Sequence, residues 1–178
     1  SFSNPRRTEI QDGEFESDIE ALIQREEMVV TVSHSGYIKR VPLHAFRAQR
    51  RGGKGKSGMA TREEDVVSDV FVANTHTPLL FFSTHGKVYE LKVYKLPLAS
   101  VQSRGKAIVN LLPLAPNERI ATIMPLPEEA STQDMFMMFA TSKGNVRRNA
   151  ISDFLNIRGN GKRAIRLDEG EELIGVRT

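Results

Sequence analysis

The stretch VVTVSHSGYIKR, residues 29–40, contains the pattern that decides the fold. An apolar run leads into a short polar turn that ends at Gly36, and polar and apolar residues alternate after it. Glycine supplies the positive φ that a tight turn needs, and strict alternation is typical of a strand with one exposed side. The stretch therefore predicts a β-hairpin with a buried first strand and a half-exposed second strand.

Two later stretches repeat this pattern. They are LLFFSTHGKVYE at residues 79–90 and FMMFATSKGNVRR at residues 136–148. The turn glycine Gly86 lies 50 residues after Gly36, and Gly144 lies 58 residues after Gly86. Each stretch therefore predicts another hairpin of the same kind.

A second landmark keeps nearly the same period. The pairs Gly55-Lys56, Gly105-Lys106 and Gly161-Lys162 are 50 and 56 residues apart. After each pair come an acid-containing turn and another apolar strand, at residues 65–72, 117–124 and 170–176. Periods of this length built from short strands are typical of propeller-like blades and not of helical solenoids.

The chain therefore divides into a lead-in, residues 1–27, and a body, residues 28–178, of three units at 28–77, 78–127 and 134–178. We expect an all-β, propeller-like fold of four-stranded antiparallel blades. Helix is expected only as a short segment at residues 18–23 and a turn at residues 44–48. Three blades do not close a propeller ring, which usually needs at least about four. The chain is expected either to belong to a longer ring or to form an open arc with exposed apolar edges.

Charge is distributed unevenly along the 178 residues. The overall net charge is only +3, but the lead-in carries −5 and the body +8. Residues 36–62 hold eight basic side chains and no acid, and residues 136–166 hold seven against one acid. Runs of one sign indicate an anionic partner, although a solvated surface is the common alternative.

Several classes of protein are excluded by composition. The chain has no cysteine, which removes disulfides, thiolate metal sites and cysteine nucleophiles. The longest apolar run, residues 135–140, is far too short to cross a membrane, so we expect no membrane partner. The four histidines have no ligand spacing, so no metal site is expected. The phenylalanines at 71, 81, 82, 136 and 139 lie in apolar runs and are expected in the core.

The densest basic motif is QRRGGKG, residues 49–55. Glycine lets the backbone approach a phosphate closely, arginine offers a planar fork to phosphate oxygens, and lysine offers a mobile point charge. A flexible basic linker would have the same composition. Lys56 and Ser57 extend the motif toward the end of a Walker A loop, but the required earlier glycine is replaced by Arg50, so we expect no ATP site.

This heptad resembles the intact gyrase-A box, the signature of the C-terminal domain of the A subunit of bacterial DNA gyrase. The segments EMVVTV at 27–32, GYIKR at 36–40 and EDVV at 64–67 agree with that family, and RRTEI at 6–10 resembles the end of its breakage–reunion region. The resemblance implies a β-pinwheel, a propeller-like disc with strands exchanged between blades, whose basic rim wraps DNA. It also implies that the chain contains about three blades of an expected six and is a piece of a longer protein.

The resemblance also implies the site residues. The box is expected to clamp the wrapped DNA, with weaker contacts from basic residues at repeat-equivalent positions and on the returning strands of the hairpins. The full set of expected DNA-binding residues is Gln49, Arg50, Arg51, Gly52, Gly53, Lys54, Gly55, Lys56, Lys39, Arg40, Arg47, Arg104, Lys106, Arg147, Arg148, Arg158, Lys162 and Arg163. In the second unit Tyr89 and Glu90 replace the basic pair of the hairpin, so the blades are not expected to contribute equally.

The family further implies a non-catalytic module. Its partners would be double-stranded DNA, the remainder of gyrase A, and gyrase B, in the bacterial cytoplasm at the nucleoid. No cofactor is expected on this chain, because ATP and Mg²⁺ would act elsewhere in the holoenzyme. Two alternatives stay open: the C-terminal domain of a topoisomerase IV-type subunit, whose box is degraded or missing, and a propeller-like protein-interaction module with an incidental basic loop.

Overall fold

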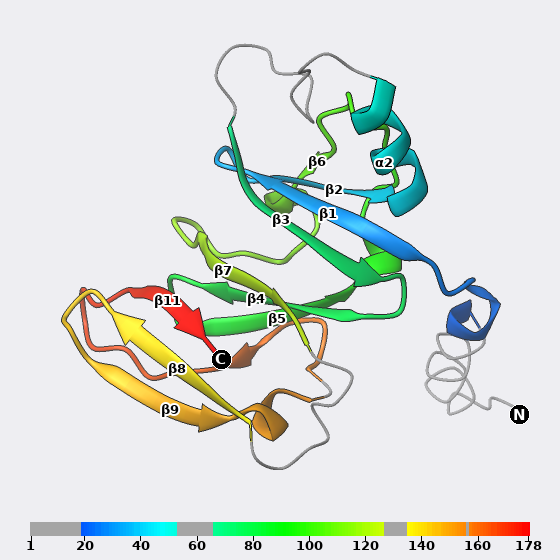
Figure 1. Cartoon of the computed structure of the whole chain (residues 1–178). Helices are drawn as coiled ribbons and strands as arrows, with labels where there is room; N and C mark the ends of the chain where they lie inside the picture. The colour runs from blue at the N-terminus through cyan, green and yellow to red at the C-terminus, as the bar shows by residue number, and fades with distance from the viewer. Residues whose placement is uncertain (1–18, 53–65, 127–134, 156) are drawn as a thin grey trace, which may run out of the picture.

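The structure is a computed structural model that describes residues 19–52, 66–126, 135–155 and 157–178. Its strands form three antiparallel sheets, which we call blades 1, 2 and 3 (Figure 1). The same hairpin register recurs in each blade, where Val32 faces Ile38, Phe82 faces Val88 and Ala140 faces Val146. The turn glycines have the expected positive φ, between 77° and 85°. The predicted all-β class and the three repeated hairpins are confirmed.

Blade 1 has the strand order β3-β1-β2-β6 and blade 2 the order β10-β5-β4-β7. Blade 3 has the order β11-β8-β9 in the part of the chain that the structure describes. In each blade the first strand of the hairpin lies between the second strand of the hairpin and the last long strand of the unit. The bounds are β1 Glu27–Ser33, β2 Tyr37–Pro42, β3 Val67–Asn74, β4 Pro78–Ser83, β5 Lys87–Lys92, β6 Lys106–Ala107, β7 Ile120–Pro125, β8 Phe136–Thr141, β9 Val146–Ala150, β10 Lys162–Arg163 and β11 Leu173–Arg177.

The fourth strand of a blade does not come from its own unit. β6 belongs to the second unit but pairs with β2 of blade 1, and β10 belongs to the third unit but pairs with β5 of blade 2. Four-stranded blades were correctly predicted for the first two sheets, and the family resemblance implied strand exchange between blades, but the sequence did not identify the Gly-Lys strand as the exchanged one. Blade 3 has three strands among the described residues because no later described segment pairs with β9.

Helix is short, as expected, with one exception. Residues 19–22 are helical, and single 3₁₀ turns occur at η1 Val93–Lys95, η2 Ile108–Asn110 and η4 Ile151–Phe154. The turn expected at residues 44–48 is instead part of a ten-residue helix, α2, Leu43–Gly52. The expectation was too short because the arginines and alanines after residue 44 are good helix formers, and a basic last turn complements the helix dipole.

Two cores fill the space between successive blades. Alternation along β4 sends Leu79 and Phe81 toward blade 1, and Leu80 and Phe82 toward blade 3. All four side chains are fully buried, so blade 2 is apolar on both faces. Phe139 packs edge-on against Phe82 in the second of these cores, with ring centroids 5.6 Å apart.

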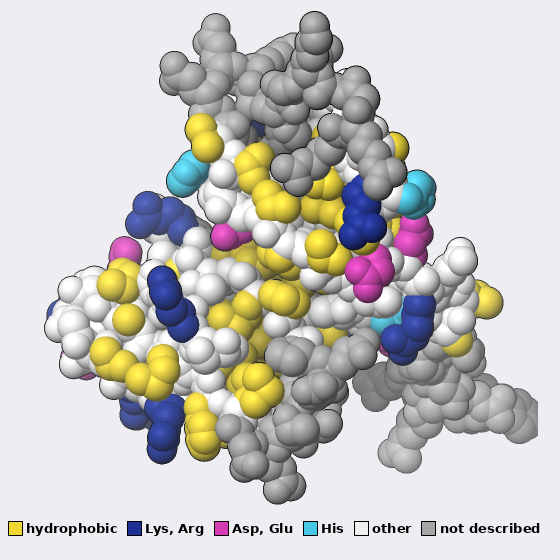
Figure 2. All heavy atoms as spheres, viewed as in Figure 1, with side chains coloured by type: hydrophobic (Ala, Val, Ile, Leu, Met, Phe, Trp, Pro, Cys, Tyr) yellow, Lys and Arg dark blue, Asp and Glu magenta, His cyan; other side chains and the backbone are white. Residues whose placement is uncertain are grey.

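Blade 3 has one buried face and one exposed face. Met137 and Phe139 are fully buried against blade 2, whereas Phe136 and Met138, which alternate with them, are 42% and 44% exposed. The expectation that Phe136 lies in the core is therefore wrong for the described residues, because none of them covers that face. Figure 2 shows hydrophobic side chains on the surface in the region where Figure 1 places β8 and β9.

The blades are arranged around a shared inner edge (Figure 1). Residues of β3, β7 and β11 contribute to the lining of one cavity of about 420 Å³, and the backbone N–H of Val176 donates to Oγ1 of Thr122 at 3.2 Å. The strands β6 and β10 lie at the opposite end of their sheets. We call the edges formed by β6 and β10 the outer edges.

We predict that Gly105→Ala destabilises the fold much more than Gly144→Ala. Both glycines have a positive φ, 84° and 80°, so both alanines meet a backbone cost of about 1–2 kcal/mol. Only at residue 105 would the new Cβ also clash with the Ile38 carbonyl, whereas nothing lies within 4 Å at residue 144. Urea unfolding midpoints of the two variants measure the difference, and equal losses would contradict close packing of β6 on β2.

Candidate nucleic-acid interface

The segment from Leu96 to Ile108 runs along β2 of blade 1, and we call it the strap. At its start the N–H of Arg40 donates to the Pro97 carbonyl at 3.0 Å, and the N–H of Ala99 donates to the Arg40 carbonyl at 3.1 Å. At its end β6 pairs with β2, and the N–H of Ile108 donates to the Gly36 carbonyl at 2.8 Å. The strap therefore fastens the second unit to blade 1 at both ends of β2.

Lys39 lies beneath the strap and is fully buried. Its Nζ donates to the carbonyls of Ser100 at 3.1 Å, Val101 at 2.6 Å and Ser103 at 2.8 Å. Burial lowers the pKa of the Lys39 ammonium to about 8, so it remains charged at neutral pH. This placement argues against the expected DNA contact of Lys39, because a fully buried ammonium bonded to three carbonyls does not reach a phosphate.

Arg40 serves the same strap. Its Nε donates to the Leu96 carbonyl at 2.9 Å, and its side chain is half-buried. Burial lowers the pKa of the Arg40 guanidinium, opposed by the charge of Glu26. The structure therefore gives Arg40 a structural role beside the strap, and its expected DNA contact stays a prediction.

The second hairpin shows why non-basic residues are tolerated at these positions. Register aligns Tyr89 with Lys39 and Glu90 with Arg40. Gly161 packs against the Tyr89 ring, and the N–H of Ile157 donates to Oε2 of Glu90 at 3.3 Å. Arg40 donates to a backbone carbonyl of the second unit, and Glu90 accepts from a backbone N–H of the third unit. Both side chains therefore hold the following unit against the returning strand. The two aligned positions therefore hold the next unit in both hairpins, although their charge differs between the hairpins.

The third hairpin places its two arginines differently. Arg147 is exposed, and Arg148 lies on the exposed apolar face of blade 3 with its guanidinium carbon 4.5 Å from the centre of the Phe136 ring. Met138 on that face is the direct cross-strand partner of Arg148. Both arginines stay predicted DNA contacts, and Arg148 is the one held over an aromatic ring.

Exposed basic side chains gather on the outer edges. Arg104 and Lys106 are exposed on the strap and on β6, and the guanidinium carbon of Arg104 lies 3.8 Å from the centre of the Tyr37 ring. The corresponding basic residues of the third unit, Arg158, Lys162 and Arg163, are also exposed. The fold therefore places basic residues that are more than 50 positions apart in the sequence on equivalent outer edges of neighbouring blades.

The heptad begins at the end of α2. Gln49 to Gly52 occupy the last turn of the helix, and Arg47 is exposed shortly before them. Gly53, Lys54, Gly55 and Lys56 lie outside the described residues. The first part of the heptad is thus helical, which the interpretation of the motif as a linker did not include.

Two buried carboxylates tie the remaining turns to the hairpins. Glu118 accepts hydrogen bonds from Oγ of Ser83 at 2.5 Å, the Tyr89 hydroxyl at 2.9 Å and the N–H of Ala115 at 2.8 Å. Burial alone would raise the pKa of Glu118, but these hydrogen bonds outweigh it and hold the pKa below the ordinary value. Burial, together with the contact to Glu118, raises the pKa of Tyr89 to about 12.

Blade 3 repeats this arrangement. Glu171 accepts from Oγ1 of Thr141 at 2.7 Å and from the N–H of Asp168 at 2.9 Å, and these bonds lower its pKa. Because both carboxylates are engaged by hydroxyl and backbone donors at equivalent positions, they stabilise the fold and are not candidates for acid–base chemistry.

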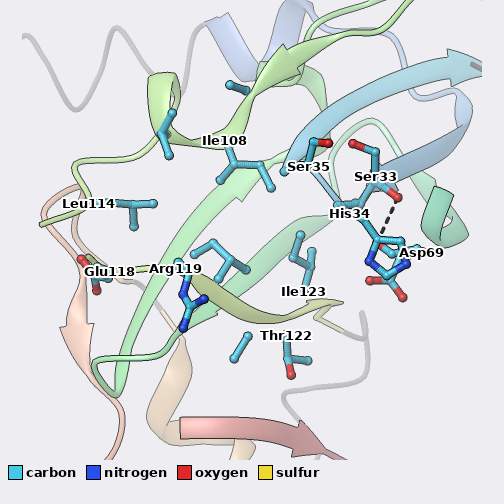
Figure 3. Close-up of a pocket in the computed structure, with 17 residues that line it drawn as sticks. Ser33, His34, Ser35, Asp69, Ile108, Leu114, Glu118, Arg119, Thr122 and Ile123 are labelled. Atoms are coloured by element: carbon cyan, nitrogen blue, oxygen red, sulfur yellow. Dashed lines mark hydrogen bonds between the residues drawn. The ribbon is translucent and has the colours of Figure 1, made fainter. Parts of the chain in front are cut away.

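A cleft of about 420 Å³ lies between blade 1 and the second unit (Figure 3). His34 and Asp69 lie together on one side of it, and Arg119 lies across from them (Figure 3). No group of three or more histidines and carboxylates suited to a metal ion occurs in the described residues. Within the same ranges, no helix is long and apolar enough to span a bilayer.

Comparison with known families decides the relationship of the chain. The family described as "DNA gyrase C-terminal domain, beta-propeller" matches residues 27–74, 77–127 and 136–178. The chain belongs to this family. Each matched segment contains one of the three repeated hairpins, so the membership extends over the three units.

Its relatives in the DNA gyrase C-terminal domain family include whole gyrase subunits. The chain is 59% identical over 177 residues to the A subunit of DNA gyrase from Rickettsia conorii, and 48% identical over 175 residues to that of Escherichia coli K12. The matches cover 99% and 98% of this chain but 20% of each relative. The chain therefore spans about a fifth of the length of these relatives.

Solved structures of the gyrase and topoisomerase IV domains share the fold. The C-terminal domain of a DNA topoisomerase IV superposes with a TM-score of 0.74 at 24% identity, over 87% of this chain and 46% of that one. The C-terminal domain of a DNA gyrase A superposes with a TM-score of 0.58 at 25% identity, over 85% and 47%. The predicted propeller-like class is confirmed by both.

Sequence reasoning about this gyrase-family chain missed two features of the site. It did not find Tyr37 beneath Arg104, since an aromatic ring on a strand predicts only packing. It also did not find that Lys39 and Arg40 bind carbonyls of the strap, although the internal repeat contained a signal for this. Tyr89 and Glu90 occupy the same register positions without positive charge, which indicates a structural requirement at both.

We predict that Lys39→Met lowers the free energy of unfolding by about 2–4 kcal/mol, because three strap carbonyls lose a charged donor in a buried place. Lys106→Met, at an exposed position of the same strap, should change it by less than about 0.5 kcal/mol. Chemical denaturation of both variants measures the values. Similar stabilities for the two variants would show that the buried ammonium does not anchor the strap.

We predict that Glu118→Gln lowers stability by about 1–3 kcal/mol at pH 7 and by progressively less in acid. The pKa of Glu118 is lower in the folded than in the unfolded state, so its stabilisation is present above the ordinary value of about 4.3 and is lost as pH falls through the folded value. Denaturation from pH 7 to pH 3 compares the variant with wild type. Glu169→Gln, at an exposed carboxylate, is the control, and a pH-independent gap for Glu118→Gln would contradict the ionic role.

Proposed function

We propose that this chain is a non-catalytic module that binds and wraps double-stranded DNA for a bacterial type IIA topoisomerase. The observation that carries the proposal is the recurrence of exposed basic side chains on the outer edges, Arg104 and Lys106 on one and Arg158, Lys162 and Arg163 on the next. Family membership supports a place within DNA gyrase, with the rest of gyrase A and with gyrase B as partners. Location at the bacterial nucleoid belongs to the same proposal.

The physical basis of binding is neutralisation of phosphates along a curved path. Each Lys or Arg that reaches a phosphate releases condensed counterions, which gives affinity without base recognition. Smooth bending of 20–30 base pairs costs on the order of 1–6 kcal/mol, so a rigid arc with several cations on its edge is required. The strap bonds and the two interblade cores supply that rigidity.

The heptad is proposed as the clamp of the wrap. Its first four residues end α2, which follows β2 without a break in the chain. A helix that ends in two arginines and continues into glycine-rich sequence offers charge and close backbone approach at one place. In the parent enzyme, wrapping of fixed hand would present a neighbouring DNA segment to the cleavage gate and let ATP hydrolysis drive negative supercoiling.

An alternative reason for lysine on edge strands does not involve DNA. Charged side chains on exposed strands hinder edge-to-edge pairing and aggregation.

The second candidate function, a protein-interaction module, is favoured by the exposed apolar face of blade 3 formed by Phe136, Met138, Val146 and Ile174. That function predicts weak DNA binding with no effect on DNA topology.

We predict that the protein alters the linking number of nicked circular DNA sealed by ligase in its presence, and that Arg50→Ala, Arg51→Ala and Lys54→Ala together abolish the change. Gel electrophoresis of the sealed circles measures it. Binding of a linear duplex should also fall steeply with salt, with a slope in log affinity of about −0.9 per phosphate contact.

The control for this experiment is Arg177→Ala, which removes a cation from β11 at the inner edge of blade 3. It should leave both readouts unchanged. Salt-insensitive or absent binding by the wild-type protein would overturn the proposed function, and wild-type behaviour of the triple variant would overturn the role of the heptad.

A further inference from the structure

We propose that Tyr37 and Lys39 are positioning residues that hold Arg104 ready as a phosphate contact where the strap of the second unit lies on β2 of blade 1. We call this place the first seam. The proposal deepens the proposed function and rests on it. It assigns to blade 1 the task of orienting a DNA contact that the second unit carries. Neither Tyr37 nor Lys39 needs to touch DNA for this role.

The backbone on both sides of Arg104 is held by blade 1. On one side, the buried Lys39 ammonium binds the carbonyl of Ser103, the residue directly before Arg104, at 2.8 Å. On the other side, Lys106 pairs with Ile38 and Ala107 with Tyr37 in the β6–β2 ladder. The residue directly before Arg104 is therefore held by a hydrogen bond, and the second residue after it is held by strand pairing.

Gly105 lies between Arg104 and that ladder. Its φ of +84° is a conformation that other residues rarely adopt, and an added Cβ would clash with the Ile38 carbonyl. The strap is consequently pressed onto β2 at this residue, which leaves Arg104 little backbone freedom. Its Cα position is set by Ile38 and Lys39 of blade 1.

The Arg104 side chain stacks on an aromatic ring of blade 1. Its guanidinium carbon lies 3.8 Å from the centre of the Tyr37 ring, within the range of a cation–π contact. Stacking engages the flat face of a guanidinium, whereas phosphate oxygens are bound by N–H groups in its plane. Stacking on Tyr37 therefore does not itself use the in-plane N–H donors, and it reduces the rotamer freedom of the Arg104 side chain. The backbone that carries the ring is also held, because the N–H of Tyr37 donates to Oγ of Ser33 at 3.2 Å.

At the place where β10 of the third unit pairs with β5 of blade 2, which we call the second seam, the corresponding residues differ. Register aligns Lys87 with Tyr37, and the position before Gly161 is Asn160 where the position before Gly105 is Arg104. The second seam thus has lysine at the position of the tyrosine and asparagine at the position of the arginine, while Tyr89 replaces Lys39. If Tyr37, Lys39 and Arg104 act together, all three are expected to differ at a seam that lacks this arrangement. The first seam is also the one next to α2 and the heptad.

The test is a double-mutant cycle on DNA affinity in the 178-residue protein, measured by fluorescence anisotropy with a 30-base-pair duplex of mixed sequence over a series of salt concentrations. Arg104→Ala should weaken binding about tenfold near 0.1 M salt and reduce the salt slope by about 0.9, the effect of one lost phosphate contact. Tyr37→Leu should weaken binding about threefold when Arg104 is present. In the Arg104→Ala background it should have no further effect, and Tyr37→Phe, which keeps the ring, should bind like wild type.

Nuclear magnetic resonance of the arginine Nε–Hε groups provides a readout that does not depend on DNA. In the wild-type protein the Arg104 signal should be shifted by the Tyr37 ring current, and the shift should disappear in Tyr37→Leu. Lys39→Met should reduce it as well, because the strap loses its anchor. Since Lys39→Met is also expected to destabilise the fold, the Tyr37 variants decide the matter if that protein fails to fold.

The outcomes separate this inference from the proposed function. Salt-dependent binding by wild type with no loss in Arg104→Ala would overturn the inference and leave the function standing. If Tyr37→Leu lowered DNA affinity equally with and without Arg104, the inference would also be overturned, since Tyr37 would then act only on stability. Absence of any duplex binding by wild type would remove the proposed function itself, whatever the resonance of Arg104 shows.

Discussion

The hydrogen bonds of the returning strands β2 and β5 constrain the whole structure, because the unit that contains each strand leaves one of its edges unpaired. An unpaired strand edge is a liability in water, and here the next unit in the chain removes it by laying a segment along that edge. Blades 1 and 2 are therefore each completed by the unit that follows. The buried charge of Lys39, the positive φ of Gly105 and the packing of Gly161 on Tyr89 all follow from the need to fit a second chain segment against the strand.

This exchange also determines which cations are available to a partner. Lys39 and Lys106 carry the same charge and lie near each other across the β2–β6 pair, since Lys106 faces Ile38. One lies under the strap with its donors directed at backbone carbonyls, and the other lies on the strap and is exposed. Position relative to the strap therefore decides whether a basic residue stabilises the fold or is available to a phosphate, and local sequence composition does not.

The sequence was sufficient for features that depend on local patterns. The hairpins at 29–40, 79–90 and 136–148 and their turn glycines follow from alternation and from repetition. It was insufficient for features that depend on which segments meet in space. The destination of Gly105-Lys106 on blade 1, the burial of Lys39 and the exposure of Phe136 are all set by neighbours distant in the chain. Helix α2 was underestimated because the residues from Gln49 to Gly52 resemble a linker by composition, although they form the last turn of the helix.

The three hairpins together show that the charge of the returning strands is not constant in this fold. Register aligns Lys39, Tyr89 and Arg147, and likewise Arg40, Glu90 and Arg148. If these positions faced a polyanion, the carboxylate of Glu90 would repel it, yet that carboxylate accepts a hydrogen bond from the backbone of Ile157. The exchanged strands, in contrast, are basic in both described exchanges, with lysine following the glycine at 106 and at 162. The exchanged strands therefore keep a positive charge in both described exchanges, whereas the charge of the strands beneath them varies.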